Sequence, residues 1–279
     1  MLNSESIKGK IRNISKAKNL RTQEVLQMYL FERILDRLEK SDYKYNFIIK
    51  GGLLISTMIG IANRTTMDMD TTVKGIELKE EVIERIIKEI LGLENQDGIK
   101  FELEKITNIR DVDEYDNFRA HIIANYGKVK NPMKIDITTG DVITPKEIEY
   151  QYPCMFQNKN IKIMAYPLET IIAEKYETII KRNISTTRAR DFYDLYILYK
   201  TRKEELNPTL LKKAIYKTAE KRDSLDEINN WNEIIYDIRN EKYLEKIWEN
   251  YIEENIYIKN IKFIEVVDVL EDFSKWLYN

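Results

Sequence analysis

The stretch from residue 47 to residue 70 constrains the fold more than any other part of the chain. An apolar run, Phe47–Ile49, leads into Gly51-Gly52, and a mostly apolar segment continues to residue 61. Asp68-Met69-Asp70 then stands in a run rich in β-branched residues. Successive side chains of a strand point to opposite faces, so the two aspartates share one face. The stretch predicts a strand, a glycine turn, a packed helix and a second strand that carries two neighbouring carboxylates.

These two carboxylates need a counter-charge, because like charges on one face repel each other and lose solvation when buried. A third acid, Asp136, is expected on the polar face of a later strand, and it completes the set if the two strands are neighbours. Clustered carboxylates hold the metal ions of nucleotidyl transfer. The pattern indicates Mg²⁺-dependent chemistry on a nucleotide, with Asp68, Asp70 and Asp136 as catalytic metal ligands. The alternative is a set of ordinary solvated acids.

Residues around the glycine turn are the candidates for binding the nucleotide phosphates, because glycine lets backbone amides approach a phosphate closely. They are Lys50, Gly51, Gly52, Ser56 and Arg64. Arg64 is compatible with a phosphate contact, an aspartate pair or a plain surface position. Ser56 could line the phosphate pocket, although a helical serine more often bonds its own backbone. His121 is expected to decorate a strand face without a role.

Composition sets few limits on the protein. Of 279 residues, 43% are hydrophobic and 33% charged, which is typical of a globular, helix-rich protein, and the formal net charge is −2. Residues 181–222 hold twelve Lys and Arg against five Asp and Glu, a local excess of +7 that suits a polyanion. The single cysteine, the polar N-terminus and the lack of a long apolar run favour a cytoplasmic protein without a membrane segment.

The order of the elements predicts an α+β fold with two lobes. A weak helix at 4–18 is expected first, then a helix at 22–40, the stretch described above with its second strand at 65–73, and a helix at 78–91 that Gly92 caps. Strands are expected at 99–107, 117–126, 132–138 and 161–164. Helices are then expected at 168–182, 187–200, 207–220, 225–239, 241–254 and 261–278. We predict a nucleotide-handling α/β lobe at 1–155 with a mixed sheet, and a helical bundle lobe at 156–279.

The helical half carries charges at helical spacing. Lys175 and Arg182 are seven residues apart and share a helix face, as do Asp191 and Asp194 at a spacing of three. Such a basic face with two acids could close over a nucleotide held by the sheet. A lattice of salt bridges within the bundle is the alternative, and these residues taken alone favour it.

Five motifs in order carry a resemblance to a known family. They are Lys50-Gly51-Gly52, Arg64 to Asp70, Lys134-Ile135-Asp136-Ile137, Ala173-Glu174-Lys175 preceded by Glu169, and Arg190 to Leu195. In this order they resemble the AbiEii/AbiGii nucleotidyltransferase toxins of abortive-infection, type IV toxin–antitoxin systems. The resemblance spans residues 22–200. It implies that Gly51, Gly52, Asp68 and Asp70 form the nucleotidyltransferase core, and that the family's essential lysine and later aspartate are Lys175 and Asp191. Leu53 departs from the Thr or Ser that many members have after the turn.

The resemblance also implies a function. It implies transfer of a nucleoside monophosphate from an NTP to an acceptor, with release of pyrophosphate, and tRNA 3′ ends are the favoured acceptor. It implies a growth-arresting toxin in phage defence, whose separately encoded antitoxin acts without obligatory direct binding. An inactive nucleotide-binding regulatory module and an adaptor without catalysis are the two alternatives.

Overall fold

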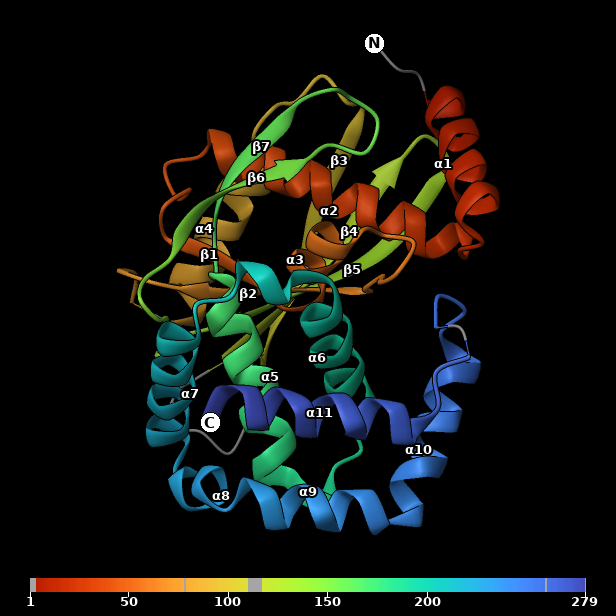
Figure 1. Ribbon diagram of the computed structural model, residues 1–279. Helices are drawn as coiled ribbons and strands as arrows, with labels where there is room; N and C mark the ends of the chain where they lie inside the picture. Colours follow the sequence, from red (N-terminus) through yellow and green to blue (C-terminus); the bar gives the residue numbers. More distant parts are fainter. Residues whose placement is uncertain (1–3, 78, 110–116, 259, 279) are drawn as a thin grey trace. The chain divides into compact units, whose positions relative to one another are not determined.

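The computed structural model describes residues 4–77, 79–109, 117–258 and 260–278 (Figure 1). The chain forms two compact units. The first comprises residues 1–141 and 147–166, and the second comprises residues 142–146 and 167–279. The combination of a mixed sheet with helices in one unit and helices alone in the other confirms the predicted fold class. The boundary predicted near residue 155 stays a prediction.

All seven described strands lie in one mixed sheet of the first unit, in the order β3-β4-β5-β2-β1-β7-β6. The pairs β1–β7 and β2–β5 are parallel, and the other neighbours are antiparallel. The two aspartate-bearing strands, β2 and β5, are therefore neighbours, which meets the condition stated for the predicted carboxylate set. The strands are β1 Phe47–Lys50, β2 Asp68–Val73, β3 Ile99–Ile109, β4 Asn117–Tyr126, β5 Val129–Thr138, β6 Ile148–Pro153 and β7 Asn160–Ala165.

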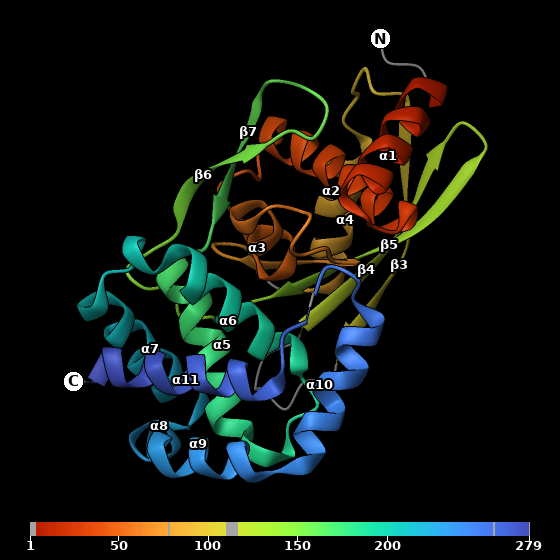
Figure 2. The ribbon, with the colours of Figure 1, turned by 45° about the vertical axis from the view of Figure 1, so that its right-hand side comes forward.

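Four helices cover the apolar side of this sheet and its edge (Figures 1 and 2). Helix α4 packs on β3 and β4, α3 on β1 and β2, α2 on β7 and α4, and α1 on α2. Alternate residues of β4, from Phe118 to Tyr126, are buried, as the period-2 pattern predicts. The helices are α1 Ser4–Lys18, α2 Thr22–Lys40, α3 Gly51–Ile59 and α4 Glu80–Gly92.

The helix expected at 4–18 is present with those bounds, because Ile7 and Ile11 recur one turn apart and are both buried. Other sequence predictions for local structure are wrong. Gly92 is the last helical residue rather than the cap, and Leu93 turns the chain into an extended conformation. Strand β6 was not predicted. The single helix expected at 225–239 is two helices, and Leu78 lies outside the described residues.

The second unit is a helical bundle around α5. Helix α5 packs against α6, α7, α8 and α9, while α11 packs against α6, α9 and α10. Aromatic rings fill the interior, and the ring centroid of Phe273 lies 5.2 Å from that of Tyr176 and 5.3 Å from that of Tyr199. The helices are α5 Leu168–Arg182, α6 Ala189–Arg202, α7 Pro208–Arg222, α8 Leu225–Asn229, α9 Trp231–Asn240, α10 Lys242–Glu254 and α11 Phe263–Tyr278.

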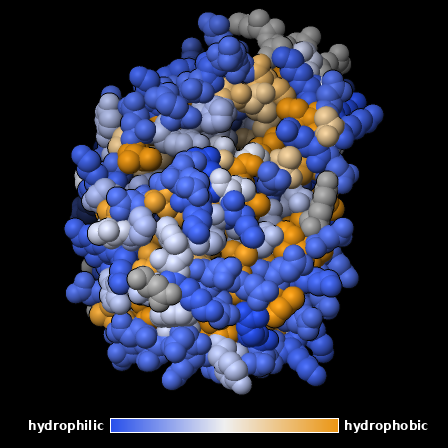
Figure 3. Space-filling view, viewed as in Figure 1, coloured by the Kyte–Doolittle hydropathy of each residue, from blue (hydrophilic) through white to orange (hydrophobic). Residues whose placement is uncertain are grey.

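The surface seen in Figure 3 is mainly hydrophilic, with apolar residues scattered over it. Of the helices in the described part of the chain, none is long and apolar enough to cross a membrane.

Candidate active site

Four charged residues form one row across the sheet. Asp70 on β2 lies between its register partners Lys50 on β1 and Asp136 on β5. Arg119 on β4 is the next partner of Asp136. Register partners project from the same face of a sheet. The two aspartates therefore lie next to each other in the row, with a cation at each end. The structure therefore brings Asp70 and Asp136 together on one face, as the sequence predicts.

Asp68 lies on the same face of β2, two residues before Asp70, and its register partner on β5 is Lys134. Two further register partners, His121 on β4 and Lys105 on β3, extend this second row. Burial lowers the pKa of His121, and the charges of Lys105, Arg119 and Lys134 lower it further. Cations therefore gather on β3–β5 beside the three aspartates.

The glycine turn lies directly against this row. Gly51 is the first residue of α3 and has a φ of +68°, in the left-handed region that favours glycine. A Cβ atom at this position would overlap Oδ2 of Asp70. Gly51 is thus required both by its backbone conformation and by the close approach of the Asp70 carboxylate. The start of α3, with its unbonded backbone amides, lies beside the carboxylate row.

The neighbouring glycine brings Arg64 into the same region. A Cβ at Gly52 would lie 3.0 Å from the Oγ1 atom of Thr66 and 3.1 Å from Nη2 of Arg64. Arg64 is 4% exposed and donates a hydrogen bond from Nη1 to the carbonyl of Thr65. The structure therefore places this guanidinium, predicted to bind nucleotide, against the glycine turn rather than in a surface loop.

Lys50 faces a residue that sequence reasoning missed. Its Nζ atom lies 2.5 Å from Oδ2 of Asp141 and 2.9 Å from Oγ1 of Thr138. The hydroxyl groups of Thr72 and Tyr166 also donate to Asp141, at 2.5 and 3.0 Å. Burial raises the pKa of Asp141, but the charge of Lys50 and these hydrogen bonds outweigh it and hold that pKa well below its usual range. The only signal in the sequence was an acid after a glycine at the end of a strand.

Arg119 was also missed. Its Nε and Nη2 atoms donate to Oδ1 and Oδ2 of Asp136, both at 2.7 Å, and its side chain is 32% exposed. The hairpin between β4 and β5 contained the signal, because a two-residue turn at Gly127-Lys128 sets Arg119 opposite Asp136. The longer connection expected at 127–131 hid this register.

Ser56 lies inside α3, and its hydroxyl group is not placed for the phosphate contact that was predicted for it. It is fully buried, and its hydroxyl donates to the carbonyl of Leu53 at 2.7 Å. This is the ordinary arrangement of a helical serine. It does not favour a phosphate contact.

The second unit holds a separate buried charge cluster. Nζ of Lys175 on α5 lies 2.6 Å from Oδ1 of Asp191 and 3.0 Å from Oδ2 of Asp194, both on α6. Nε of Arg188 contacts Oδ2 of Asp191 at 2.6 Å. The aspartates are at most 1% exposed. Burial lowers the pKa of Lys175, but the two carboxylates outweigh it and keep this pKa above its usual value. The pKa of Asp191 falls to about 2 because Lys175 and Arg188 outweigh its burial.

Arg182 does not join this cluster. It is exposed at the C-terminal end of α5, about 10 Å along the helix from Lys175. Two tyrosines of the segment 181–222, which carries the local excess of positive charge, are core residues, since Tyr193 and Tyr199 are buried. Lys213 and Lys217 are exposed one turn apart on α7.

The three aspartates on this face of the sheet differ in how well they fit a divalent cation. Asp68, Asp70 and Asp136 offer oxygen ligands on one face of neighbouring strands, the donor type that Mg²⁺ prefers. Arg119 holds both oxygens of Asp136, and the described residues contain no group of three acidic, His or Cys side chains arranged to hold a metal. Mg²⁺ usually takes one or two carboxylates and completes its shell with water and substrate phosphates. Asp68 and Asp70 fit this pattern, and Asp136 fits it once Arg119 releases it.

Comparison with solved structures defines the class of fold. The chain is similar to JHP933 of Helicobacter pylori, with 16% identity, a TM-score of 0.56 and 93% of both chains covered. A putative nucleotidyltransferase of H. pylori matches at 17% identity and a TM-score of 0.53, covering 93% of this chain and 96% of that one. MenT4, a nucleotidyltransferase toxin of Mycobacterium tuberculosis, matches at 12% identity and a TM-score of 0.53, covering 96% and 99%. These likenesses establish a nucleotidyltransferase-like fold.

The family follows from the sequence itself. The family described as "Nucleotidyl transferase AbiEii toxin, Type IV TA system" matches residues 33–272. The chain therefore belongs to the AbiEii family of nucleotidyltransferase toxins from type IV toxin–antitoxin systems, which confirms the resemblance. It is a nucleotidyltransferase, and its family implies a nucleotide substrate and an antitoxin. Enzymes of this class generally use a divalent metal ion with the nucleoside triphosphate. No curated protein sequence gave a match.

Proposed function

We propose that this toxin transfers a nucleoside monophosphate from an NTP to the 3′ end of a tRNA in a Mg²⁺-dependent reaction. One observation carries the proposal: Asp70 contacts the glycine turn on one side and is the register partner of Asp136 on the other. The proposed phosphate site at the glycine turn therefore lies directly beside the carboxylate pair of Asp70 and Asp136. Asp68, on the same face, supplies the third carboxylate.

Each residue has a role in this proposal. The amides of Gly51 and Gly52 bind phosphate oxygens at the start of α3. Arg64, held against Gly52, adds a guanidinium to the same phosphates. Asp68, Asp70 and Asp136 would hold Mg²⁺, which neutralises charge on the attacking and leaving oxygens when bound. Lys50 stays with Asp141 and supports the strand end, so its predicted phosphate contact is the weakest part of this set.

The roles proposed for residues of the second unit come from the family resemblance. Lys175 and Asp191 match the family's functional lysine and later aspartate. We propose that Lys175 neutralises the donor phosphates. Asp191 would fix the position of the Lys175 side chain, since Oδ1 of Asp191 lies 2.6 Å from Nζ of Lys175. Arg182 is proposed as an outer phosphate contact.

The acceptor is proposed from charge. The +7 excess of residues 181–222 and the cations on β3–β5 suit the phosphate backbone of a nucleic acid. A single-stranded RNA end suits cations with nearby aromatic residues. Because NTP and tRNA are cytoplasmic substrates, we place the reaction there. An antitoxin that acts without binding the toxin completes the proposed phage-defence system.

The test is direct labelling. The protein is incubated with each labelled NTP, Mg²⁺ and either total cellular RNA or total protein. We expect label on tRNA 3′ ends, and loss of label in Asp68→Asn with the fold retained, since that change relieves carboxylate repulsion. Label on protein or on other RNA would refute the acceptor. An unchanged rate in folded Asp68→Asn would refute the metal site, and absence of any label under all conditions would favour an inactive regulatory module.

A further inference from the structure

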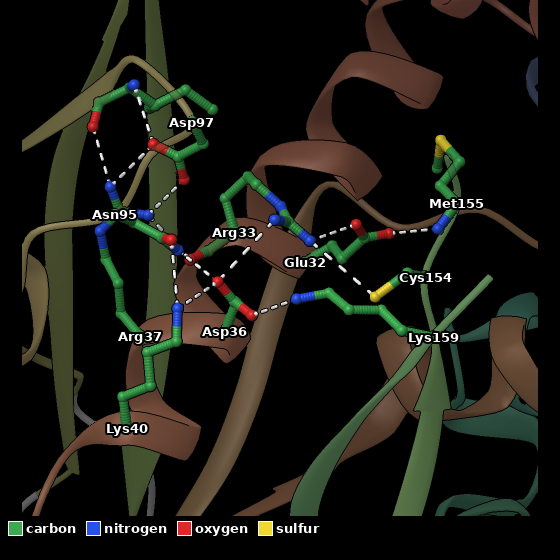
Figure 4. Close-up of polar contacts among 11 residues, drawn as sticks. Glu32, Arg33, Asp36, Arg37, Lys40, Asn95, Asp97, Cys154, Met155 and Lys159 are labelled. Carbon is green, nitrogen blue, oxygen red and sulfur yellow. Dashed lines mark hydrogen bonds and ion pairs between the residues drawn. The ribbon is translucent and has the colours of Figure 1, made fainter. Parts of the chain in front are cut away.

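Helix α2 buries four charged residues within six positions. Glu32, Arg33, Asp36 and Arg37 are each at most 3% exposed. Figure 4 shows them between the segment from Asn95 to Asp97 on one side and the segment from Cys154 to Lys159 on the other. Buried charges are costly unless each is paired and hydrogen-bonded. The pairing within this cluster therefore indicates what it still lacks.

The carboxylates of the cluster are fully supplied with donors. Asp36 receives Nζ of Lys40 and of Lys159, each at 3.0 Å, and the side-chain amide of Asn95. Asp97 takes two hydrogen bonds from Arg37, at 2.7 and 3.1 Å. Glu32 accepts from Arg33 at 2.5 Å and from the backbone amide of Met155 at 2.6 Å. This set of acids therefore has little capacity left for a cation.

Among the described residues, the two arginines of the cluster have hydrogen-bond donors that lack a partner. Arg33 has one close oxygen partner, Glu32, and Asp36 lies 3.8 Å from its Nη1 atom. Within the described part of the chain, the buried Nε atoms of Arg33 and Arg37 have no hydrogen-bond partner. The cluster counts four cations, Arg33, Arg37, Lys40 and Lys159, against the three acids Glu32, Asp36 and Asp97, an excess of one positive charge. The unmet groups are donors, and the unmet charge is positive.

A cavity of about 350 Å³ lies beside Arg33 and Lys159. The ring of Tyr29, the amide side chains of Gln96 and Gln157, and the already bonded carboxylates of Asp36 and Asp97 complete its lining. Ligand pockets in proteins begin at about this volume. Arg33 is held in place by Glu32 and lies over the Tyr29 ring, with its guanidinium carbon 5.5 Å from the ring centroid. A fixed guanidinium with a partly exposed lysine beside it suits a small oxyanion.

We infer that this cavity is a binding site for a phosphate group, either free phosphate or the phosphate of a small phosphomonoester, with Arg33 and Lys159 as its main contacts. An oxyanion in the cavity accepts hydrogen bonds from Arg33 and Lys159 and neutralises the excess charge of the cluster. A metal ion does neither. The site lies apart from the carboxylate row and does not depend on the proposed nucleotidyl transfer.

The test measures phosphate binding by the full chain at constant ionic strength, by calorimetry and by the phosphorus NMR line width. Inorganic phosphate and glycerol 3-phosphate are titrated separately, which distinguishes the two sources. We expect saturable binding at one site. Arg33→Gln and Lys159→Gln should each weaken it about tenfold or more, since a charge-assisted hydrogen bond is lost. Lys162→Gln, at an exposed lysine three residues beyond Lys159, is the matched control and should leave it unchanged.

Arg33→Gln leaves Glu32 without its partner, so the double variant Glu32→Gln/Arg33→Gln serves if the single one does not fold. Lys159 is exposed, and its variant is expected to fold in any case. Absence of saturable binding to the unmodified chain would overturn the proposal, since the cavity then holds only water. Equal weakening by Lys162→Gln, or none by Lys159→Gln, would overturn it as well, because the phosphate would then be bound elsewhere.

Discussion

Arg119 donates hydrogen bonds to both carboxylate oxygens of Asp136, each at 2.7 Å. Asp136 lies on β5, between the strand of Arg119 and the strand that carries Asp70. Asp136 therefore already has a cation, and a metal ion has to compete with it. The same bond keeps the Asp136 carboxylate on the site face of the sheet. Arg119 thus fixes the position of this carboxylate, and it would compete with any cation that Asp136 binds.

We expect Arg119→Gln to increase the affinity of the free protein for Mn²⁺, because it releases Asp136. The free energy of unfolding should fall by no more than about 1 kcal/mol, since the pair is partly exposed. Calorimetry with Mn²⁺ alone and urea unfolding measure the two quantities. Lys130→Gln, which removes a charge from an exposed site on β5, is the control. Equal Mn²⁺ affinities in both variants would show that Asp136 is not a ligand.

Gly51→Ala should inactivate the enzyme, because the new methyl group would displace the Asp70 carboxylate. Gly98→Ala is a well-matched control: φ is +71° there against +68° at Gly51, but a Cβ would meet no atom within 4 Å. The shared backbone strain costs about 1 kcal/mol in either variant. Any extra loss of stability in Gly51→Ala measures the clash with Asp70. Full activity in a folded Gly51→Ala protein would argue against this turn as the phosphate site.

Lys175→Met should destabilise the protein by about 3–5 kcal/mol, because it removes the buried ammonium group that Asp191 and Asp194 share. Lys175→Arg keeps the charge and should restore most of that stability. If Lys175 acts on the donor phosphates, the arginine variant remains slower by about 10²–10³. Urea unfolding and single-turnover labelling separate the two effects. Recovery of stability and rate together would leave Lys175 with a structural role only.

Acid should weaken the second unit through Asp191. Its pKa is about 2 in the folded protein against an ordinary 3.8, so folding favours the charged form. This contribution, about 2 kcal/mol, is fully present above pH 4 and disappears as the pH falls towards 2. Asp191→Asn should therefore flatten the loss of stability between pH 5 and pH 2 by that amount. Asp226→Asn, at an exposed position, should leave it unchanged, and an equally steep loss in both variants would contradict the assignment.

Reversing Lys213 and Lys217 to Glu should weaken tRNA binding and make its salt dependence shallower, because fewer counterions are released. Both side chains are exposed on α7, so the fold should tolerate the change. NTP binding in the absence of RNA should stay the same. Filter binding over a range of salt concentrations measures the slope. An unchanged slope would move the acceptor surface elsewhere, for instance to the cations on β3–β5.

Much of the sheet and its carboxylates could be predicted from the sequence. Alternation along β4 and β5 identified strands and faces, because one face of each is buried. The neighbourhood of Asp70 and Asp136, in contrast, depends on a parallel pairing between β2 and β5, which local patterns do not encode. From the sequence, this adjacency is therefore only a condition, and the structure supplies it.

The missed partners share one cause. Arg119 and Asp141 contact residues 17 and 91 positions away in the chain, and only the register of the sheet brings them there. Arg33 was unremarkable because charged residues on a helix are normally solvated. Its burial depends on two loops that cover α2, and neither has a sequence pattern of its own.

The pairing of β1 with β7 has a consequence for protein synthesis. Ile48 and Ile49 on β1 pair in parallel with Met164 and Ala165 on β7, more than a hundred residues later. A nascent chain that ends before residue 160 therefore carries β1 as an open sheet edge, a known template for aggregation. We therefore expect fragments that stop short of β7 to aggregate more readily than the full chain.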